Sequence, residues 1–329
     1  MYGELIDVLR CPRSGARLRL EEGHYSDGRV QSGWLVGEDG RNRYPVRDFI
    51  PRFVPESNYA DNFGMQWNAF RRTQLDSYSG QPISARRFWT ATAWRAQDLA
   101  GQWVLDAGCG AGRFAEIALQ AGAKVVALDY SNAIDACYEN LGQHPNLHCV
   151  QGDINALPFP NGLFPFVYSF GVLMCTPDTA RAFAALPPMV AAGGRLCVDF
   201  YGLRFGTLLQ AKWVFRPITS RMRPRTLFRL LQSAVPVMLP ISQFLGAVPA
   251  LGVYLKRLIP VANYTGIYPL NTAQLKEWAL LDTFDMLAPK YDHPEPTAGR
   301  LRRWLEAAGL AHVEVFHAGH LVGRGSKVA

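Results

Sequence analysis

The sequence lacks paired cysteines. Its six cysteines in 329 residues stand singly in the chain, at positions 11, 109, 137, 149, 175 and 197. This scatter is typical of reduced thiols and excludes both a disulfide framework and a zinc site with paired ligand spacing. A basic, apolar leader is also missing, because the opening "MYGELIDVLR" carries acids where a signal peptide carries basic residues. We therefore expect a cytoplasmic protein with no metal site.

Acidic residues are missing from one long segment. Between Phe200 and Lys276 there is no Asp or Glu, while Lys and Arg occur ten times. The whole chain has a net charge of +7, so the remainder is close to neutral, at −3. The basic character is therefore local, and a neutral remainder counts against nucleic acid as the partner.

A long apolar run without helix breakers is also missing. Residues 234–254 carry no charge over a length that could span a bilayer, but Pro236, Pro240 and Pro249 interrupt them. We predict a helical lid over residues 203–265 that buries its apolar stripe on a substrate cavity. In this interpretation Arg223 and its neighbouring arginines face outward or bind an anionic substrate. The alternative is peripheral contact of this insertion with acidic membrane lipids.

What the sequence does contain, from residue 102 onward, is an alternation of short apolar runs and helical stretches. This pattern predicts an α/β fold with a doubly wound, mainly parallel, seven-stranded sheet and ligands at the carboxyl ends of its strands. We divide the chain into a β-rich appendage, a core with preceding helices, the lid, and a carboxyl-terminal part that completes the core with a helix and two strands. The predicted ranges are 1–55, 56–202, 203–265 and 266–329.

The stretch "VLDAGCGAGRF", residues 104–114, lacks the third glycine of a dinucleotide fingerprint, because Arg113 stands at that position. Its spacing is D-x-G-x-G-x-G, with Asp106, Gly108, Gly110 and Gly112 after an apolar strand. The glycines allow the backbone to approach a ligand closely. A carboxylate at Asp106 suits a cationic ammonium and sulfonium better than a pyrophosphate.

Two further acids follow the next strands. Asp129 ends "KVVALD", where it can accept hydrogen bonds from ribose hydroxyls, and Asp153 in "QGDINALPF" can meet the exocyclic amine of an adenine. Three acids at three consecutive strand ends predict a site for one adenosine.

These motifs, with "VYSFGVLMCTPD" and "GGRLCVDFY", resemble those of class I S-adenosylmethionine-dependent methyltransferases over residues 102–202. The resemblance implies S-adenosylmethionine as the cofactor. It implies that Gly108, Cys109 and Gly110 line the methionine part of the cofactor and that Asp129 and Tyr130 bind its ribose. Asp153 and Ile154 would then contact the adenine, and Phe170 would form the wall beside the donor sulfur. This chain departs from the family at Pro165, where an acid is usual, and at Met174 and Cys175, where histidines are usual.

The appendage resembles the zinc-ribbon-like module that some methyltransferases carry. Of its ligand pattern only Cys11 remains, with Ser14 at the place of the second cysteine, and His24 cannot complete a tetrahedron with Cys11 alone. We therefore expect a metal-free scaffold.

Candidate acceptor-site residues lie in the carboxyl-terminal part. Asp282, Asp285, Tyr291, Asp292 and His293 are expected in one loop over the substrate. Histidine suits a base near neutral pH, so we predict His293 as the base and Tyr291 as an orienting hydroxyl. The predicted substrate contacts are Tyr201, Met174 and Arg223.

The sequence thus predicts a methyltransferase that acts on the oxygen or nitrogen of a small molecule, such as a glycan, a lipid-linked compound or a natural-product intermediate. An RNA base methyltransferase and a non-catalytic S-adenosylmethionine-binding protein remain the alternatives. The oligomeric state stays open.

Overall fold

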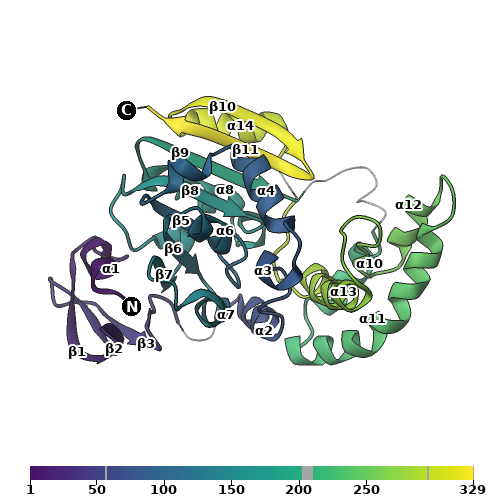
Figure 1. The fold of residues 1–329 in the computed structure, drawn as a ribbon, viewed down its shortest axis with the longest axis horizontal. Helices are drawn as coiled ribbons and strands as arrows, with labels where there is room; N and C mark the ends of the chain where they lie inside the picture. Colours follow the sequence, from purple (N-terminus) through teal and green to yellow (C-terminus); the bar gives the residue numbers. More distant parts are fainter. Residues whose placement is uncertain (56–57, 202–209, 295, 329) are drawn as a thin grey trace.

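A computed structural model describes residues 1–55, 58–201, 210–294 and 296–328. Its centre is a seven-stranded sheet in the order β10-β11-β9-β8-β5-β6-β7 (Figure 1). The strands are β5 (Trp103–Ala107), β6 (Lys124–Asp129), β7 (Leu147–Gln151), β8 (Phe164–Phe170), β9 (Val190–Phe200), β10 (Leu310–Ala318) and β11 (His320–Lys327). β5 to β9 pair in parallel, and β11 is antiparallel to both of its neighbours. The predicted doubly wound fold is confirmed.

The parallel strands are buried on both faces, as their unbroken apolar runs predict. Val104 and Leu105 in β5 have no exposed surface, and neither have Val125 and Val126 in β6. The helices between the strands are α6 (Ala115–Gln120), α7 (Ala133–Leu141) and α8 (Thr179–Ala184). β5 pairs with β6 on one side and with β8 on the other. The order in which strands are added to the sheet therefore reverses beside β5, and ligands of such folds bind at this point.

The first 55 residues form a second, antiparallel sheet in the order β1-β2-β3-β4. Its strands are β1 (Leu18–Ser26), β2 (Arg29–Gly37), β3 (Arg43–Arg47) and β4 (Ile50–Pro51), preceded by a helix, α1 (Gly3–Val8), that the sequence did not predict. Leu5 and Leu35 share one buried cluster with Leu105 of the central sheet. The N–H of Phe53 donates to the carbonyl of Gln151 at 2.8 Å, so this part covers the edge strand β7.

Among the described residues, four helices lie between β4 and the central sheet. They are α2 (Asp61–Ala69), α3 (Asp76–Ser79), α4 (Ile83–Thr92) and α5 (Ala96–Leu99). α2 packs against α7, and α4 against β9 and β10. They bring Trp67 and Arg87 to the carboxyl ends of the parallel strands.

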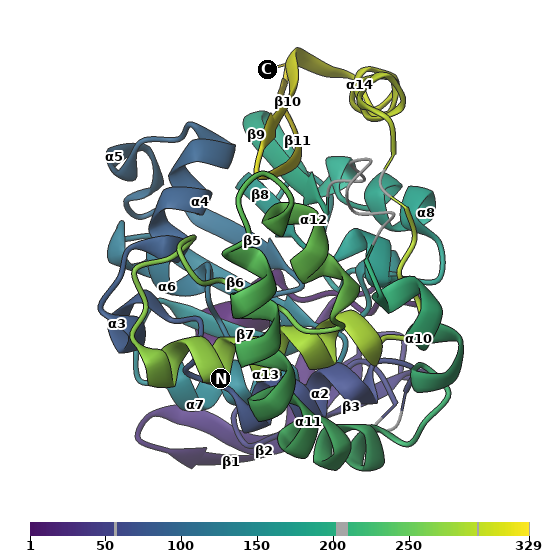
Figure 2. The same ribbon diagram turned by 90° about the vertical axis from the view of Figure 1, so that its right-hand side faces the viewer.

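The lid is helical in its described part, while residues 203–209 of the predicted range lie outside the described residues. It consists of α10 (Lys212–Thr219), α11 (Pro224–Gly246) and α12 (Gly252–Leu255), and it packs on α13 (Thr272–Leu287) (Figures 1 and 2). The expected break at the prolines is wrong, because α11 continues through Pro236 and Pro240. Both prolines lie on the exposed side, where water can bind the carbonyls that they leave without a donor.

Two strands of the carboxyl-terminal part, β10 and β11, form one edge of the central sheet. α14 (Ala298–Ala307) begins after Thr297, whose side chain accepts a hydrogen bond from the N–H of Arg300. Gly309 ends it with a φ of +74°, and β10 follows. Among the described residues, no helix combines the length and the apolar character needed to cross a membrane.

Candidate active site

The glycine loop follows β5 and needs its glycines for two different reasons. Gly108 has a φ of +93°, and a Cβ there would lie 2.4 Å from Cγ2 of Val172. At Gly112, where φ is +91°, a Cβ would lie 2.8 Å from Cδ1 of Leu141 on α7. Gly108 therefore borders the ligand side of the loop, and Gly112 lets the loop pack on a helix.

Asp129, the last residue of β6, holds this loop in place. Its Oδ2 accepts a hydrogen bond from the N–H of Gly110 at 2.9 Å, and its Oδ1 accepts from the N–H and the hydroxyl of Ser131 at 2.8 and 2.7 Å. Burial raises the pKa of Asp129, while the three donors partly offset this effect. The carboxylate therefore lies fixed beside Gly110.

The third predicted acid faces the same space from the turn after β7. Oδ1 of Asp153 accepts hydrogen bonds from the N–H and the side chain of Asn155, which leaves Oδ2 available to a ligand. Tyr130 stacks on Tyr59 with ring centroids 4.8 Å apart. Two aromatic rings and the buried Ile154 thus provide flat, apolar walls next to one carboxylate oxygen.

These groups line a narrow cavity of about 130 Å³, which we call the donor cavity. Eight of the predicted cofactor residues lie on it: Gly108, Cys109, Gly110, Asp129, Tyr130, Asp153, Ile154 and Phe170. Asp106 and Gly112 do not line it. Asp106 is 2% exposed, and burial raises the pKa of its carboxyl group. The donor-binding roles of these two residues stay predictions.

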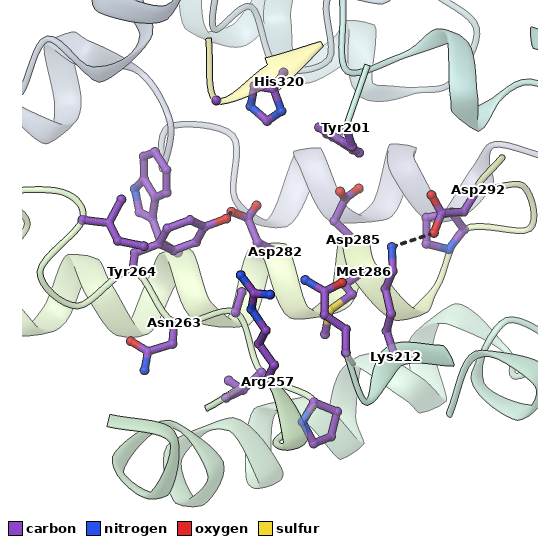
Figure 3. A pocket seen from close by; sticks show the side chains of 18 of the residues that line it. Tyr201, Lys212, Arg257, Asn263, Tyr264, Asp282, Asp285, Met286, Asp292 and His320 are labelled. Atoms are coloured by element: carbon purple, nitrogen blue, oxygen red, sulfur yellow. Dashed lines mark hydrogen bonds and ion pairs between the residues drawn. The ribbon is translucent and has the colours of Figure 1, made fainter. Parts of the chain in front are cut away.

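A larger cavity of about 510 Å³, which we call the acceptor cavity, lies between α13 and the lid (Figure 3). Its size is that of a small-molecule site. α13 contributes Asp282, Asp285 and Met286, the start of α10 contributes Lys212, and residues 256–264 form the opposite wall.

The two cavities share part of their walls, so a group bound in one is next to a group bound in the other. The shared residues are Trp67, Gln74, Arg87, Arg113, Cys175, Tyr201 and Asp285. Tyr201 lies where the two cavities meet. Its hydroxyl oxygen is close to Gly171 of the donor cavity, where a Cβ would lie only 2.8 Å from it.

Asp285 is the one carboxylate among the described residues that lines both cavities. Burial, with the neighbouring charges of Asp282 and Asp292 adding to it, raises the pKa of Asp285 to about 7. The expectation that these acids share a loop is corrected, since Asp282 and Asp285 lie on α13. They are three residues apart and therefore occupy the same helix face.

Two of the cations that line the cavities form ion pairs. Arg87 binds Asp199 through both Nε and a terminal nitrogen, at 3.0 and 2.7 Å, and Lys212 binds Asp292 at 3.1 Å. Within the described part of the chain, Arg113 donates only to neutral groups, Oγ of Ser84 and Oε1 of Gln74, both at 2.8 Å. Burial and the nearby charge of Arg87 lower the pKa of Arg113.

Two lid cations differ from these. Lys256 and Arg257 line the acceptor cavity, and no carboxylate within the described ranges lies within ion-pair distance of either. Figure 3 shows the Arg257 side chain extending into the cavity toward Asp282 and Asp285. This wall therefore offers positive charge to a ligand.

The residues predicted for catalysis and substrate binding separate into two groups. Tyr201 and His293 line the acceptor cavity, and Nε2 of His293 is buried without a hydrogen-bond partner among the described residues. Tyr291 stacks on His293 with a centroid distance of 6.0 Å but lines neither cavity. Met174 is buried in the core, and Arg223 is exposed at the start of α11, so the structure brings neither to a cavity.

Several residues of the cavity walls are not predicted by the sequence pattern. Tyr59, Phe63 and Trp67 belong to α2 and the turn before it, and Arg87 to α4. The aromatic stretch "FGMQWNAF" is a signal for a helix that packs on the core, but it does not show which of its side chains line a cavity. Nothing in the local sequence marks Arg257 as a cavity residue, because Asp285 on the facing wall follows it by 28 residues and belongs to α13.

The appendage does not assemble a metal site in its described residues. Cys11 is buried with its Sγ 3.3 Å from the hydroxyl of Tyr44, and His24 is exposed on β1. Across all described residues, no three His, Cys, Asp or Glu side chains gather as a metal ion requires.

Residues 105–198 match the family described as "Methyltransferase domain". Curated relatives include an uncharacterized chloroplastic methyltransferase of Arabidopsis thaliana, 31% identical over 37% of this chain and 36% of that protein. Another is a malonyl-[acyl-carrier protein] O-methyltransferase of Pseudescherichia vulneris, 33% identical over 36% of this chain and 46% of its own. A demethylmenaquinone methyltransferase of Renibacterium salmoninarum is 35% identical over 32% of this chain and 44% of its own.

A solved structure, PigF with S-adenosylhomocysteine, is similar at 13% identity with a TM-score of 0.47, covering 83% of this chain and 63% of that chain. The chain spans less than half the length of each curated relative reported above. The matched segment contains the glycine loop and the acids after β6 and β7. The chain therefore contains a class I S-adenosylmethionine-dependent methyltransferase domain, and S-adenosylmethionine is its cofactor.

Proposed function

We propose that this protein transfers a methyl group from S-adenosylmethionine to an oxygen or nitrogen of a small, anionic acceptor, and that Asp285 takes the proton of the acceptor. The observation that carries the proposal is the position of Asp285 on the wall shared by the donor and acceptor cavities.

The donor-cavity residues fit S-adenosylmethionine. Asp129 is suited to the ribose hydroxyls, and Oδ2 of Asp153 to an amine on the adenine, whose faces can lie against Tyr130 and Ile154. Arg113, which donates to the neutral side chains of Ser84 and Gln74, is suited to the carboxylate of the methionine part. When bound, the cofactor supplies an electrophilic methyl group on a sulfonium.

The chain's own contribution is alignment, exclusion of water and proton transfer. The acceptor atom forms its bond to the methyl carbon while the carbon–sulfur bond breaks, and its proton passes to the Asp285 carboxylate. A base with a pKa near the working pH is effective, typically by about 10²- to 10⁴-fold. His293, with an unpartnered Nε2 on the acceptor cavity, is the second candidate for this role.

Lys256 and Arg257 support an anionic acceptor, because both line the cavity and neither forms an ion pair with a carboxylate of the described residues. The names of the relatives give two different acceptors, malonyl-[acyl-carrier protein] and demethylmenaquinone. Glycan, lipid-linked and natural-product intermediates that carry a carboxylate or phosphate are the acceptors that we propose.

The test begins with calorimetric titration of the full chain with S-adenosylmethionine, for which we expect saturable binding. A panel of small hydroxyl and amine compounds, in pairs with and without a carboxylate or phosphate, is then screened for release of S-adenosylhomocysteine. We expect turnover with the anionic members and a raised KM in Arg257→Gln. Arg225→Gln is the control, since Arg225 is exposed on the lid and lines neither cavity. Absence of binding heat would refute the proposed function, and turnover of the neutral members alone would refute the anionic acceptor.

A further inference from the structure

Exposed apolar side chains are concentrated on the lid. Of the 17 large apolar side chains that are exposed in the described chain, 12 lie between residues 213 and 258. Phe244 is 76% exposed, Val214 73% and Ile218 69%. Single exposed apolar residues are ordinary, but such a concentration marks an interaction surface.

Helix α11 has two separate apolar faces. Leu227, Leu231, Val235 and Leu239 are buried against α13. Leu230, Val237, Ile241 and Phe244 are exposed. At 100° per residue this second set spans an arc of about 60°, centred about 130° from the first. The second stripe therefore points away from the protein.

α10 and α12 extend this stripe. Val214 and Ile218, one helical turn apart, are exposed on α10, and Val253 and Tyr254 are exposed on α12. Figure 2 shows the three helices together as the outermost layer of one side of the molecule. We call their exposed side chains the outer lid surface.

The outer lid surface also carries positive charge. Arg223, Arg225 and Arg229 are exposed at the start of α11, and within the described ranges no carboxylate lies within ion-pair distance of them. No acidic residue occurs between Phe200 and Lys276 in the sequence, so nothing local neutralises them.

We propose that the outer lid surface docks onto an anionic lipid bilayer, with the exposed stripe of α11 at the level of the acyl chains and the three arginines against the phosphates. An amphipathic helix with Lys or Arg on its polar side is the structure that lies in a bilayer interface. A second copy of this chain would bring like charges together. A nucleic acid would satisfy the arginines but would leave Val237, Ile241 and Phe244 in water.

The test uses the full chain and vesicles of phosphatidylcholine with 30% phosphatidylglycerol, or of phosphatidylcholine alone, in flotation assays. We expect binding to the anionic vesicles that weakens between 0.1 and 0.5 M salt. Each arginine contributes roughly a fivefold gain in binding, so R223E/R225E/R229E should bind at least about a hundredfold more weakly. V237S/I241S/F244S should lose the binding that remains at high salt.

The matched control is R300E/R302E/R303E, which changes the net charge equally on α14, at another edge of the molecule (Figure 1). It should bind as the unmodified chain does. Calorimetric binding of S-adenosylmethionine and the melting temperature verify that each variant is folded, so the outcome is independent of the proposed function. The proposal is overturned if the unmodified chain does not float with anionic vesicles, or if both arginine variants lose binding equally. The proposal is also overturned if the unmodified chain does not bind lipid and light scattering shows that it forms a dimer that V237S/I241S/F244S dissociates. The outer lid surface would then bind a second copy of this chain.

Discussion

Replacing Asp285 by Asn should make the protein more stable and less active at the same time. The pKa of Asp285 in the folded protein is about 7, against an ordinary value of 3.8. A difference of about 3 units corresponds to about 4 kcal/mol, at 1.36 kcal/mol per unit. This is an upper value, because the side chain borders a cavity that admits water.

The sign follows from proton linkage. The folded state binds the Asp285 proton more tightly than the unfolded state does, so the associated stability is fully present below pH 3.8 and is lost as the pH rises through about 7. Asn carries no charge at any pH. Asp285→Asn should therefore match the unmodified chain near pH 4 and exceed its free energy of unfolding by up to about 4 kcal/mol at pH 8.

Urea unfolding at pH values from 4 to 8.5 measures this difference. Asp98→Asn is the control, because Asp98 is paired with Arg95 and its pKa is lowered, so that removal of its charge gives no gain at pH 8. If the gain of Asp285→Asn is the same at pH 4 and pH 8, the carboxyl group is not buried as described and the reasoning fails.

Activity should move in the opposite direction. With an acceptor found in the panel, kcat/KM of the unmodified chain should rise with pH up to about 7 and then level off, since the base must be deprotonated. In Asp285→Asn, kcat should fall by about 10²- to 10⁴-fold. His293→Asn separates the two candidate bases. If His293→Asn loses kcat and Asp285→Asn retains it, the proton goes to the histidine.

Three further outcomes are expected. Asp129→Ala should weaken S-adenosylmethionine binding by at least about 1 kcal/mol in calorimetry, and an unchanged affinity would refute the ribose assignment. Gly108→Ala should weaken it roughly tenfold or more, because its Cβ meets Val172, whereas Gly162→Ala, with a φ of +71° and nothing within 4 Å, should bind normally. A chelator should leave the melting temperature unchanged, since Cys11 bonds to a tyrosine hydroxyl, and one zinc per chain in elemental analysis would overturn this expectation.

The donor side of the site could be predicted because its determinants are local in sequence. Each parallel strand ends in a turn at the same edge of the sheet, so Asp129 and Asp153 follow from the strand pattern alone. The spacing of Gly108, Gly110 and Gly112 marks a loop with positive φ values, all three of which occur. The same logic does not tell whether an acid lies on the cavity wall, and Asp106, which is buried and does not line the donor cavity, keeps its donor-binding role only as a prediction.

The acceptor side could not be predicted in the same way, because its walls join segments far apart in the chain. Arg87, Lys212, Arg257 and Asp285 come from four separate elements, and only the fold brings them together. The pKa of Asp285 depends on burial between these elements, which no local pattern reports. The prediction of His293 as the base used residue type instead of position, and it stays a prediction. We propose Asp285 first because its side chain lines both cavities, whereas His293 lines only the acceptor cavity.

The lid shows a further limit of sequence patterns. A charge-free stretch such as 234–254 is compatible with a membrane span, a buried helix or a helix with two apolar faces, since all three are rich in apolar residues. The fold distinguishes them, because Val235 and Leu239 are buried against α13 while Val237 and Ile241 point outward. Residues two positions apart on a helix face different directions, so one stretch can pack against α13 with one face and remain open to a bilayer with the other.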